Sequence, residues 1–186
     1  MQNASDGHQI DFDFISSLEG GNILQAYVPD PKNSKSGVTL AVGFDIGARN
    51  EHDLRELGLP PELISQLSPY LGLQGMDAKR YLDQHPFSIS SEHAITINKS
   101  VKAAMIARVV NDYNEASESK FASLSARWQT VIASVSFQYG SLPKRCPSFW
   151  RCVINQDWHG AIVELRDFGD RYPSRRNKEA DYVEHA

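Results

Sequence analysis

Apolar residues return at helical spacing in the second half of the chain, and they predict two long helices. Residues 99–117 carry apolar side chains along one side, at Val101, Met105, Val109 and Tyr113, which is the pattern of an amphipathic helix. Residues 127–139 differ because they are apolar almost all round. A helix without a polar face is typically buried, so we expect this one at the centre of a helical lobe.

Shorter patterns predict the remaining elements. Residues 11–18 form an amphipathic helix that stops at Gly20-Gly21. Residues 23–47, apolar and broken by glycines, predict a small β-region with a polar turn at 29–37. Further short helices are expected over residues 53–57, 61–68, 77–84, 91–97, 149–155, 158–168 and 178–183. The predicted fold class is α+β, dominated by helices.

Length and charge narrow the classes of protein. A chain of 186 residues fits one domain, or two small lobes that share a long helix. A net charge of −4 and a pI near 5.8 argue against a nucleic-acid-binding protein. No apolar run approaches the ~20 residues of a membrane-spanning helix. The polar start of the chain lacks the regions of a signal peptide, which predicts either another export route or an excised domain.

Several kinds of site have no counterpart in the sequence. The six histidines are scattered without a His-Glu-x-x-His motif, and two cysteines are too few for a zinc site. There is no Gly-x-Ser-x-Gly elbow and no phosphate-binding loop. We therefore expect neither a metal nor a cofactor. Cys146 and Cys152 could form a bridge if their loop folds back, but two buried free thiols are the favoured alternative.

Two carboxylic acids mark the candidate chemistry. Glu19 stands at the end of the first predicted helix, and Asp45 lies in Gly43-Phe44-Asp45-Ile46-Gly47 at a strand end. Glycoside hydrolysis needs one carboxyl group to protonate the leaving oxygen and another to direct water or act as nucleophile. The negative end of a helix dipole disfavours a charged acid, which suits a general acid. An ordinary exposed glutamate and a turn-forming aspartate are the alternatives.

Four motifs in sequence order resemble the pesticin-like muramidases, which are bacterial toxin relatives of the phage-type lysozymes. The first combines Glu19-Gly20-Gly21 with Tyr27-Val28-Pro29, Gly37-Val38-Thr39 and residues 43–47. Residues 89–94 resemble the capped middle helix of that fold. Residues 125–129, running on to Ser136-Phe137-Gln138-Tyr139-Gly140, resemble its buried helix and the following turn. Residues 149–158 and 172–176 resemble its closing helices, so the similarity spans about residues 11–182.

The resemblance implies a phage-lysozyme-like fold, predominantly helical, with a small N-terminal β-region and a long helix joining two lobes. It implies a single catalytic domain over residues 11–186, preceded by a disordered or linker segment at residues 1–10. The β-containing lobe is expected at about residues 19–85, and the helical lobe at about residues 99–186.

The same resemblance implies roles for individual residues. Glu19 is the general acid and Asp45 the second carboxylate, while the Thr39 hydroxyl helps to position the attacking water. Asp30 is the rival second carboxylate, because other phage-type lysozymes place theirs in the β-turn. Arg175 matches the family arginine that pairs with the catalytic glutamate, in a supporting role. Three further residues are expected to contact the sugar: Phe137, Gln138 and Gly43.

The implied activity is cleavage of the β-1,4 bond between N-acetylmuramic acid and N-acetylglucosamine in peptidoglycan, with inversion at the anomeric carbon. A non-catalytic module that binds glycan strands is the alternative. The resemblance also implies an antibacterial toxin or secreted effector domain that is delivered to the periplasm of a target bacterium. We expect a monomer whose partners are peptidoglycan and an immunity or inhibitor protein.

Overall fold

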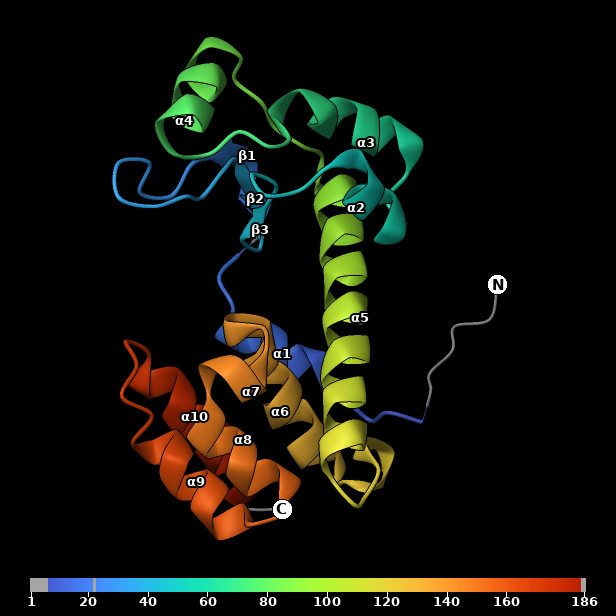
Figure 1. The fold of residues 1–186 in the computed structure, drawn as a ribbon, viewed down its shortest axis with the longest axis vertical. Helices are drawn as coiled ribbons and strands as arrows, with labels where there is room; N and C mark the ends of the chain where they lie inside the picture. Colours follow the sequence, from blue (N-terminus) through green and yellow to red (C-terminus); the bar gives the residue numbers. More distant parts are fainter. Residues whose placement is uncertain (1–6, 22, 185–186) are drawn as a thin grey trace. The chain divides into compact units, whose positions relative to one another are not determined.

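The computed structural model describes residues 7–21 and 23–184, and in them the chain is α+β and mostly helical (Figure 1). It folds into two compact units. The sheet unit comprises residues 20–104, and the helical unit comprises residues 7–19 and 105–184. In chain order the elements are α1 (Phe12–Leu18), β1 (Ile23–Tyr27), β2 (Thr39–Ala41), β3 (Phe44–Asp45), α2 (Glu51–Glu56), α3 (Pro61–Leu67), η1 (Ser68–Tyr70), α4 (Gly75–Gln84), α5 (Ser91–Ala116), η2 (Phe121–Ser123), α6 (Ala126–Tyr139), α7 (Leu142–Arg145), α8 (Pro147–Ile154), α9 (Trp158–Arg166) and α10 (Pro173–Glu184).

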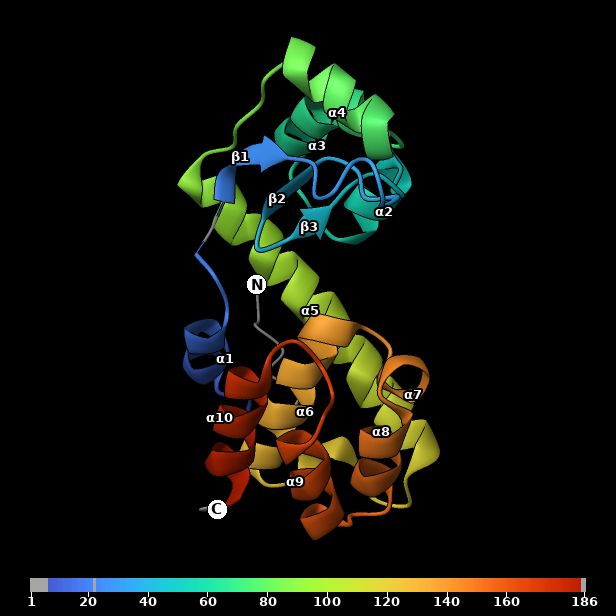
Figure 2. The ribbon, with the colours of Figure 1, turned by 90° about the vertical axis from the view of Figure 1, so that its left-hand side faces the viewer.

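The sheet unit is built on three short antiparallel strands in the order β1-β2-β3. Thr39 pairs with Asp45 across β2 and β3, so both candidate residues stand at the same level of the hairpin. Apolar side chains of the sheet pack with those of α3 and α4, whose helices lie against the strands in Figure 2. The fully buried members of this core include Val38, Leu40, Ile46, Leu63, Leu67 and Ala78.

The helix α5 is longer than the sequence predicts. Residues 91–97 and 99–117 were expected as two helices, but Ser91–Ala116 is one helix. The segment between them holds Asn98, and an asparagine weakens a helix without breaking it as glycine or proline would. Its side chain has a tertiary function, because Asn98 Oδ1 accepts the backbone N–H of Val42 at 3.3 Å. The helix thereby anchors the turn between β2 and β3.

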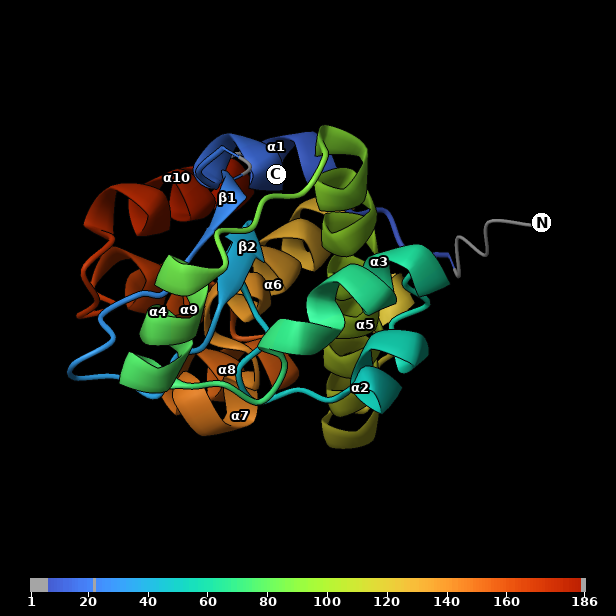
Figure 3. The same ribbon diagram turned by 90° about the horizontal axis from the view of Figure 1, so that it is seen from above.

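The helical unit surrounds α6, as the pattern of residues 127–139 predicts. Every residue from Trp128 to Ser136 is buried, and Ser125 caps the helix by accepting the N–H of Trp128. Helices α7 to α10 lie about α6 (Figure 1), and the core of the unit takes Phe149, Val153 and Leu165 from α8 and α9. Figures 2 and 3 show α1 beside α10, where the rings of Phe14 and Tyr182 stack with centroids 3.9 Å apart.

Besides α5, the helix that differs most from its predicted extent is α10, the last one. The last helix was expected at residues 178–183 but begins at Pro173, whose fixed φ suits the first turn of a helix. The short helix α7 was not predicted. Of the expected N-terminal linker 1–10, residues 1–6 lie outside the described residues. In the described part, the Gln9 N–H donates to Gln129 Oε1 at 2.8 Å, and the domain boundary near residue 11 stays a prediction.

Candidate active site

Glu19 follows the last residue of α1, where the backbone becomes extended. Its φ and ψ are −96° and 154°, and its N–H donates to the Ser16 carbonyl at 3.2 Å. At the other end of α1, the Asp11 carboxylate accepts the N–H of Phe14 and the hydroxyl of Tyr182, each at 2.9 Å. These bonds, the Phe14 N–H first, lower the pKa of Asp11. Asp11 thus caps the start of α1, and Glu19 is a half-buried acid directly after its last residue.

Two backbone N–H groups hold the carboxylate of Asp45. Its Oδ1 accepts from Gly47 at 2.8 Å and from Gly37 at 3.0 Å, and its Oδ2 lies 3.2 Å from the same Gly37 nitrogen. Hydrogen bonds to a charged acceptor are among the stronger ones in proteins, so the carboxylate has a defined orientation at the end of β3. An ionised carboxylate offers about four acceptor positions, which leaves capacity for a water molecule.

Thr39 contacts the same glycine from the other side of the hairpin. Its side chain is 2% exposed, and its hydroxyl donates to the Gly37 carbonyl at 3.1 Å. Gly37 thus gives its N–H to Asp45 and accepts at its carbonyl from Thr39. Because the only hydroxyl proton is committed to Gly37, Thr39 can act toward a water molecule only as an acceptor.

A close approach of two glycines creates this arrangement. A Cβ atom on Gly37 would lie 2.2 Å from the Gly47 Cα and 2.4 Å from the Leu73 carbonyl oxygen. A Cβ on Gly47 would lie 2.5 Å from the Gly37 Cα. No side chain fits at those distances, so glycine is required at both positions. The two N–H groups converge on Asp45 because the two backbones touch.

The remaining residues of the β-region have simpler environments. Gly43 lies exposed in the turn between β2 and β3 with a φ of 78°, in the left-handed region that favours glycine. Asp30, the rival second carboxylate, has a φ of 41°, and its Oδ1 accepts from Asn33 Nδ2 at 2.9 Å. Its carbonyl also accepts the N–H groups of Asn33 and Ser34. Asp30 thus has the contacts of a turn-forming residue.

Phe137 and Gln138 occupy the last turn of α6, before Gly140 ends the helix with a φ of 74°. Both side chains are half-buried. The amide oxygen of Gln138 accepts a hydrogen bond from Nη2 of Arg176 in α10. Gln138 therefore links α6 to α10, which is a structural role. Its predicted contact with the sugar stays a prediction.

Arg175 lies in the first turns of α10, and its side chain is 14% exposed. Its Nε lies 3.2 Å from Glu179 Oε1, and its Nη2 donates to the Ser134 hydroxyl at 3.1 Å and to the Ser134 carbonyl at 3.2 Å. These contacts join α10 to α6. They fit a structural brace, and the pairing with the catalytic glutamate stays a prediction.

Sequence reasoning missed the most buried charged residues in the described part of the chain, Arg176 and Glu179. They are 1% and 0% exposed, with Arg176 Nη1 3.0 Å from Glu179 Oε2. Burial raises the pKa of Glu179, against the attraction of Arg176 and Arg175. The rings of Phe168 and Tyr139 lie 5.0 Å and 5.8 Å from the Arg176 guanidinium. The spacing of arginine and glutamate by three and four residues could have indicated these pairs.

Comparison with known families places the chain. Residues 9–159 match the Pesticin family, described as a bacterial toxin homologue of phage lysozyme, C-terminal. The chain belongs to this family. Its helical majority and small antiparallel sheet are consistent with the phage-lysozyme-like fold. No curated protein matches the chain.

The Pesticin-family match confirms the resemblance read from the motifs and makes the chain a lysozyme-like toxin domain of the muramidase type in general. Glu19, Thr39, Asp45 and the end of α6 lie inside the matched range, whereas Arg175 lies outside it. Thr39, Gly43 and Asp45 belong to the sheet unit. Glu19, Phe137, Gln138 and Arg175 belong to the helical unit.

The described residues of this Pesticin-family domain contain no helix that is long and apolar enough to cross a membrane. No group of three or more histidine, cysteine or acidic side chains in the same residues is placed to hold a metal ion. Cys146 and Cys152 are free thiols.

Proposed function

We propose that this Pesticin-family domain is a muramidase that hydrolyses the β-1,4 bond between N-acetylmuramic acid and N-acetylglucosamine in peptidoglycan. Glu19 donates the proton to the leaving oxygen, and Asp45 with Thr39 orients the attacking water. One observation carries the proposal: Asp45 is fixed by the Gly37 and Gly47 N–H groups, while Thr39 binds the carbonyl of the same Gly37.

In this mechanism Asp45 and Thr39 share one task. Both offer only acceptor positions to a water molecule, because the Thr39 proton is bound to Gly37. A water that donates its two protons to these oxygens turns a lone pair toward the anomeric carbon. Asp45 takes up a proton as the new C–O bond forms, and Glu19 gives its proton to the departing sugar oxygen.

This use of Asp45 as a base predicts inversion of configuration. A base that activates water leaves room for that water, with carboxyl groups about 6.5–9.5 Å apart in inverting enzymes. Proton NMR of the first product released from a β-linked strand should show the α-anomer. A first-formed β-anomer would mean a covalent intermediate and a nucleophilic Asp45.

The decisive experiment is digestion of purified peptidoglycan, followed by analysis of the new reducing ends. The wild-type chain should release N-acetylmuramic acid ends, and Glu19→Gln should be slower by about 10²–10⁴-fold with an unchanged melting temperature. The alternative, a glycan-binding module without catalysis, predicts that wild-type protein binds the wall material and releases no reducing ends.

The proposed biological role is that of an antibacterial toxin or secreted effector domain acting in the periplasm of a target cell. Family membership supports a toxin, and the wall substrate lies outside the cytoplasmic membrane. Expression in a bacterial host should therefore lyse the cells only when the domain is directed to the periplasm. A monomeric state and an immunity protein that blocks the enzyme are parts of the same proposal, tested by light scattering and by co-expression with neighbouring genes.

A further inference from the structure

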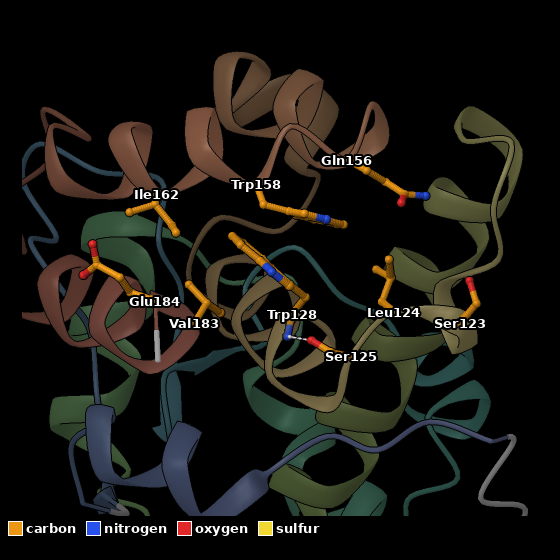
Figure 4. Close-up of a pocket in the computed structure, with 9 residues that line it drawn as sticks. All are labelled: Ser123, Leu124, Ser125, Trp128, Gln156, Trp158, Ile162, Val183 and Glu184. Atoms are coloured by element: carbon orange, nitrogen blue, oxygen red, sulfur yellow. Dashed lines mark hydrogen bonds between the residues drawn. The ribbon is translucent and has the colours of Figure 1, made fainter. Parts of the chain in front are cut away.

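The helical unit contains a pocket that the proposed mechanism does not use. Its volume is about 410 Å³, within the range of small-molecule sites. Figure 4 shows the rings of Trp128 and Trp158 crossing its middle. Ile162 and Val183 lie on one side of the rings, and Leu124 and Gln156 lie on the other. We refer to it as the Trp pocket.

The two tryptophans form a rigid aromatic platform. Their ring centroids are 4.5 Å apart with an interplanar angle of 28°, so the rings stack. Trp128 comes from the buried helix α6 and is 6% exposed, whereas Trp158 at the start of α9 is half-buried. Trp128 is therefore the fixed base of the stack, and Trp158 presents its remaining surface to the pocket.

Both hydrogen-bond donors and hydrogen-bond acceptors line the pocket around this platform. Within the described residues, neither the Trp128 nor the Trp158 indole N–H donates a hydrogen bond, and neither nitrogen is sealed from solvent. Gln156 has a left-handed φ of 55° and donates its side-chain amide to Ser119 Oγ at 2.6 Å, which leaves its amide oxygen as an acceptor. Ser123 and Ser125 also line the pocket; the Ser123 hydroxyl donates to the Lys120 carbonyl, and the Ser125 hydroxyl accepts the Trp128 backbone N–H.

The charge of the pocket restricts its ligand. Among the described residues, Glu184 is the only charged one that lines the pocket, and its carboxylate pairs with Arg166 at 2.5 Å. Because none of these described lining residues is a cation, the pocket is unsuited to phosphate or to a free carboxylate. The pocket therefore favours a neutral ligand. Such a ligand has one apolar face, and groups at its edge both donate and accept hydrogen bonds.

A pyranose ring with an acetamido group has this chemistry. Its C–H face covers an aromatic ring, its hydroxyls donate and accept, and its amide adds one group of each kind. We propose that the Trp pocket binds N-acetylglucosamine units of the glycan strand, as a second saccharide site. N-acetylmuramic acid is disfavoured because no cation among the described lining residues would pair with its lactyl carboxylate. The choice of glycan rests on the proposed function, whereas the binding chemistry rests on the pocket.

The experiment follows the indole N–H signals of the three tryptophans by ¹H–¹⁵N NMR in the full chain. Glu19→Gln is used so that the probe, a β-1,4-linked N-acetylglucosamine tetramer, is not hydrolysed. The signals of Trp128 and Trp158 should shift and saturate, while that of Trp150, buried at 6% exposure in the core, should not. Unmoved Trp128 and Trp158 signals at saturating tetramer would overturn the proposal, as would shifts produced only by the peptidoglycan stem peptide.

Variants test the contacts directly. Trp158→Leu keeps an apolar side chain but removes the ring and its N–H, and should weaken tetramer binding about tenfold, read on the Trp128 signal. Val163→Ala, on the same helix but outside the pocket and 52% exposed, is the matched control and should bind like the parent. Gln156→Ala should also weaken binding and serves if Trp158→Leu fails to fold. Unchanged affinity in the folded variants would overturn the site.

Hydrolysis by the chain with Glu19 intact separates this proposal from the muramidase proposal. Wall hydrolysis without tetramer shifts at Trp128 and Trp158 would overturn the Trp pocket alone. Tetramer shifts without any wall hydrolysis would overturn the muramidase alone and leave the pocket as a saccharide site.

Discussion

Single residues of the β-region owe their geometry to hydrogen bonds that leave few alternatives. Asp45 accepts from two glycine N–H groups, whereas Asp30 accepts from the amide of Asn33 inside its own turn. Asp30 lies in a polar turn and Asp45 at the end of β3, and of the two only Asp45 shares a backbone partner with Thr39. On this difference we propose Asp45, and not Asp30, as the second carboxylate.

Substitution of these aspartates should separate their roles. Asp45→Asn should lower the rate of reducing-end release by about 10²–10⁴-fold, while its amide oxygen still accepts from Gly37 and Gly47 and preserves the fold. Thr39→Ala should have a smaller effect, and Asp30→Asn should be nearly normal. An active Asp45→Asn beside an inactive Asp30→Asn would identify Asp30 as the second carboxylate.

The thiol of Cys146 should make stability depend on pH. Burial raises the pKa of Cys146 to about 11, against about 8.5 in an unfolded chain. Between these values the folded state keeps a proton that the unfolded state loses, so the free energy of unfolding should fall as the pH rises from about 8.5 to 11. Urea denaturation across this range should show a shallower fall for Cys146→Ala. Identical slopes for both proteins would contradict the assignment.

At the scale of elements, contacts between backbones and between buried charges decide how strands and helices meet. The loops before β2 and after β3 touch at Gly37 and Gly47. The helices α6 and α10 are joined by Ser134 and Gln138 on one side and by the arginines and Glu179 on the other.

Gly37→Ala should destabilise the domain by about 1–3 kcal/mol or more, because its Cβ would lie 2.2 Å from the backbone of Gly47. Chemical denaturation measures the change. Gly20→Ala is the control: its Cβ would meet no atom within 4 Å, so its stability should change by less than about 1 kcal/mol. Equal stability of the two variants would mean that the loops adapt without cost.

Arg176→Met should cost about 3–5 kcal/mol, since it leaves the charge of Glu179 buried with a weakened set of partners. The double variant Arg176→Met/Glu179→Leu should regain much of that loss. Arg166→Ala removes a more exposed pair with Asp181 and Glu184 and should have a much smaller effect, because surface ion pairs are screened by solvent. Melting curves test all three, and a double variant less stable than Arg176→Met would refute this account.

At the scale of the whole molecule, the described residues form two apolar cores. One gathers the sheet with α3 and α4, and the other gathers α6 with α8, α9 and α10. The helix α5 contributes Ile97 to the first core and Val109 and Tyr113 to the second. Because the chain has two apolar cores, we expect the two units to unfold locally and independently of each other.

Hydrogen exchange should reveal this division. Leu63→Ala, at a fully buried position of the sheet unit, should lower amide protection mainly in residues 20–104. Phe149→Ala, in the core of the helical unit, should lower it mainly in residues 105–184. Each substitution should cost about 2–5 kcal/mol locally. Equal loss of protection throughout the chain in both variants would indicate a single cooperative unit.

The sequence by itself determined the elements and the family. The apolar pattern of residues 127–139 predicts a buried helix, and α6 is one, because a run of apolar side chains without a polar face is written in the local sequence and is stable only in a core. The motifs around Glu19 and Asp45 identified the family for the same reason. A turn that requires glycine at fixed positions produces a fixed spacing of glycines, which can be recognised in the sequence. The fold class followed from the order of such segments.

Only the tertiary structure decided which side chains share a partner. Gly37 meets Gly47, Arg175 meets Ser134, Arg176 meets Gln138, and Trp128 stacks on Trp158. The continuity of α5 through Asn98 was equally hidden, since its side chain binds a turn more than fifty residues earlier. Periodicity reports the environment of a residue but not the identity of its neighbour. Contacts between distant segments depend on how the elements pack, and packing is set by the whole core.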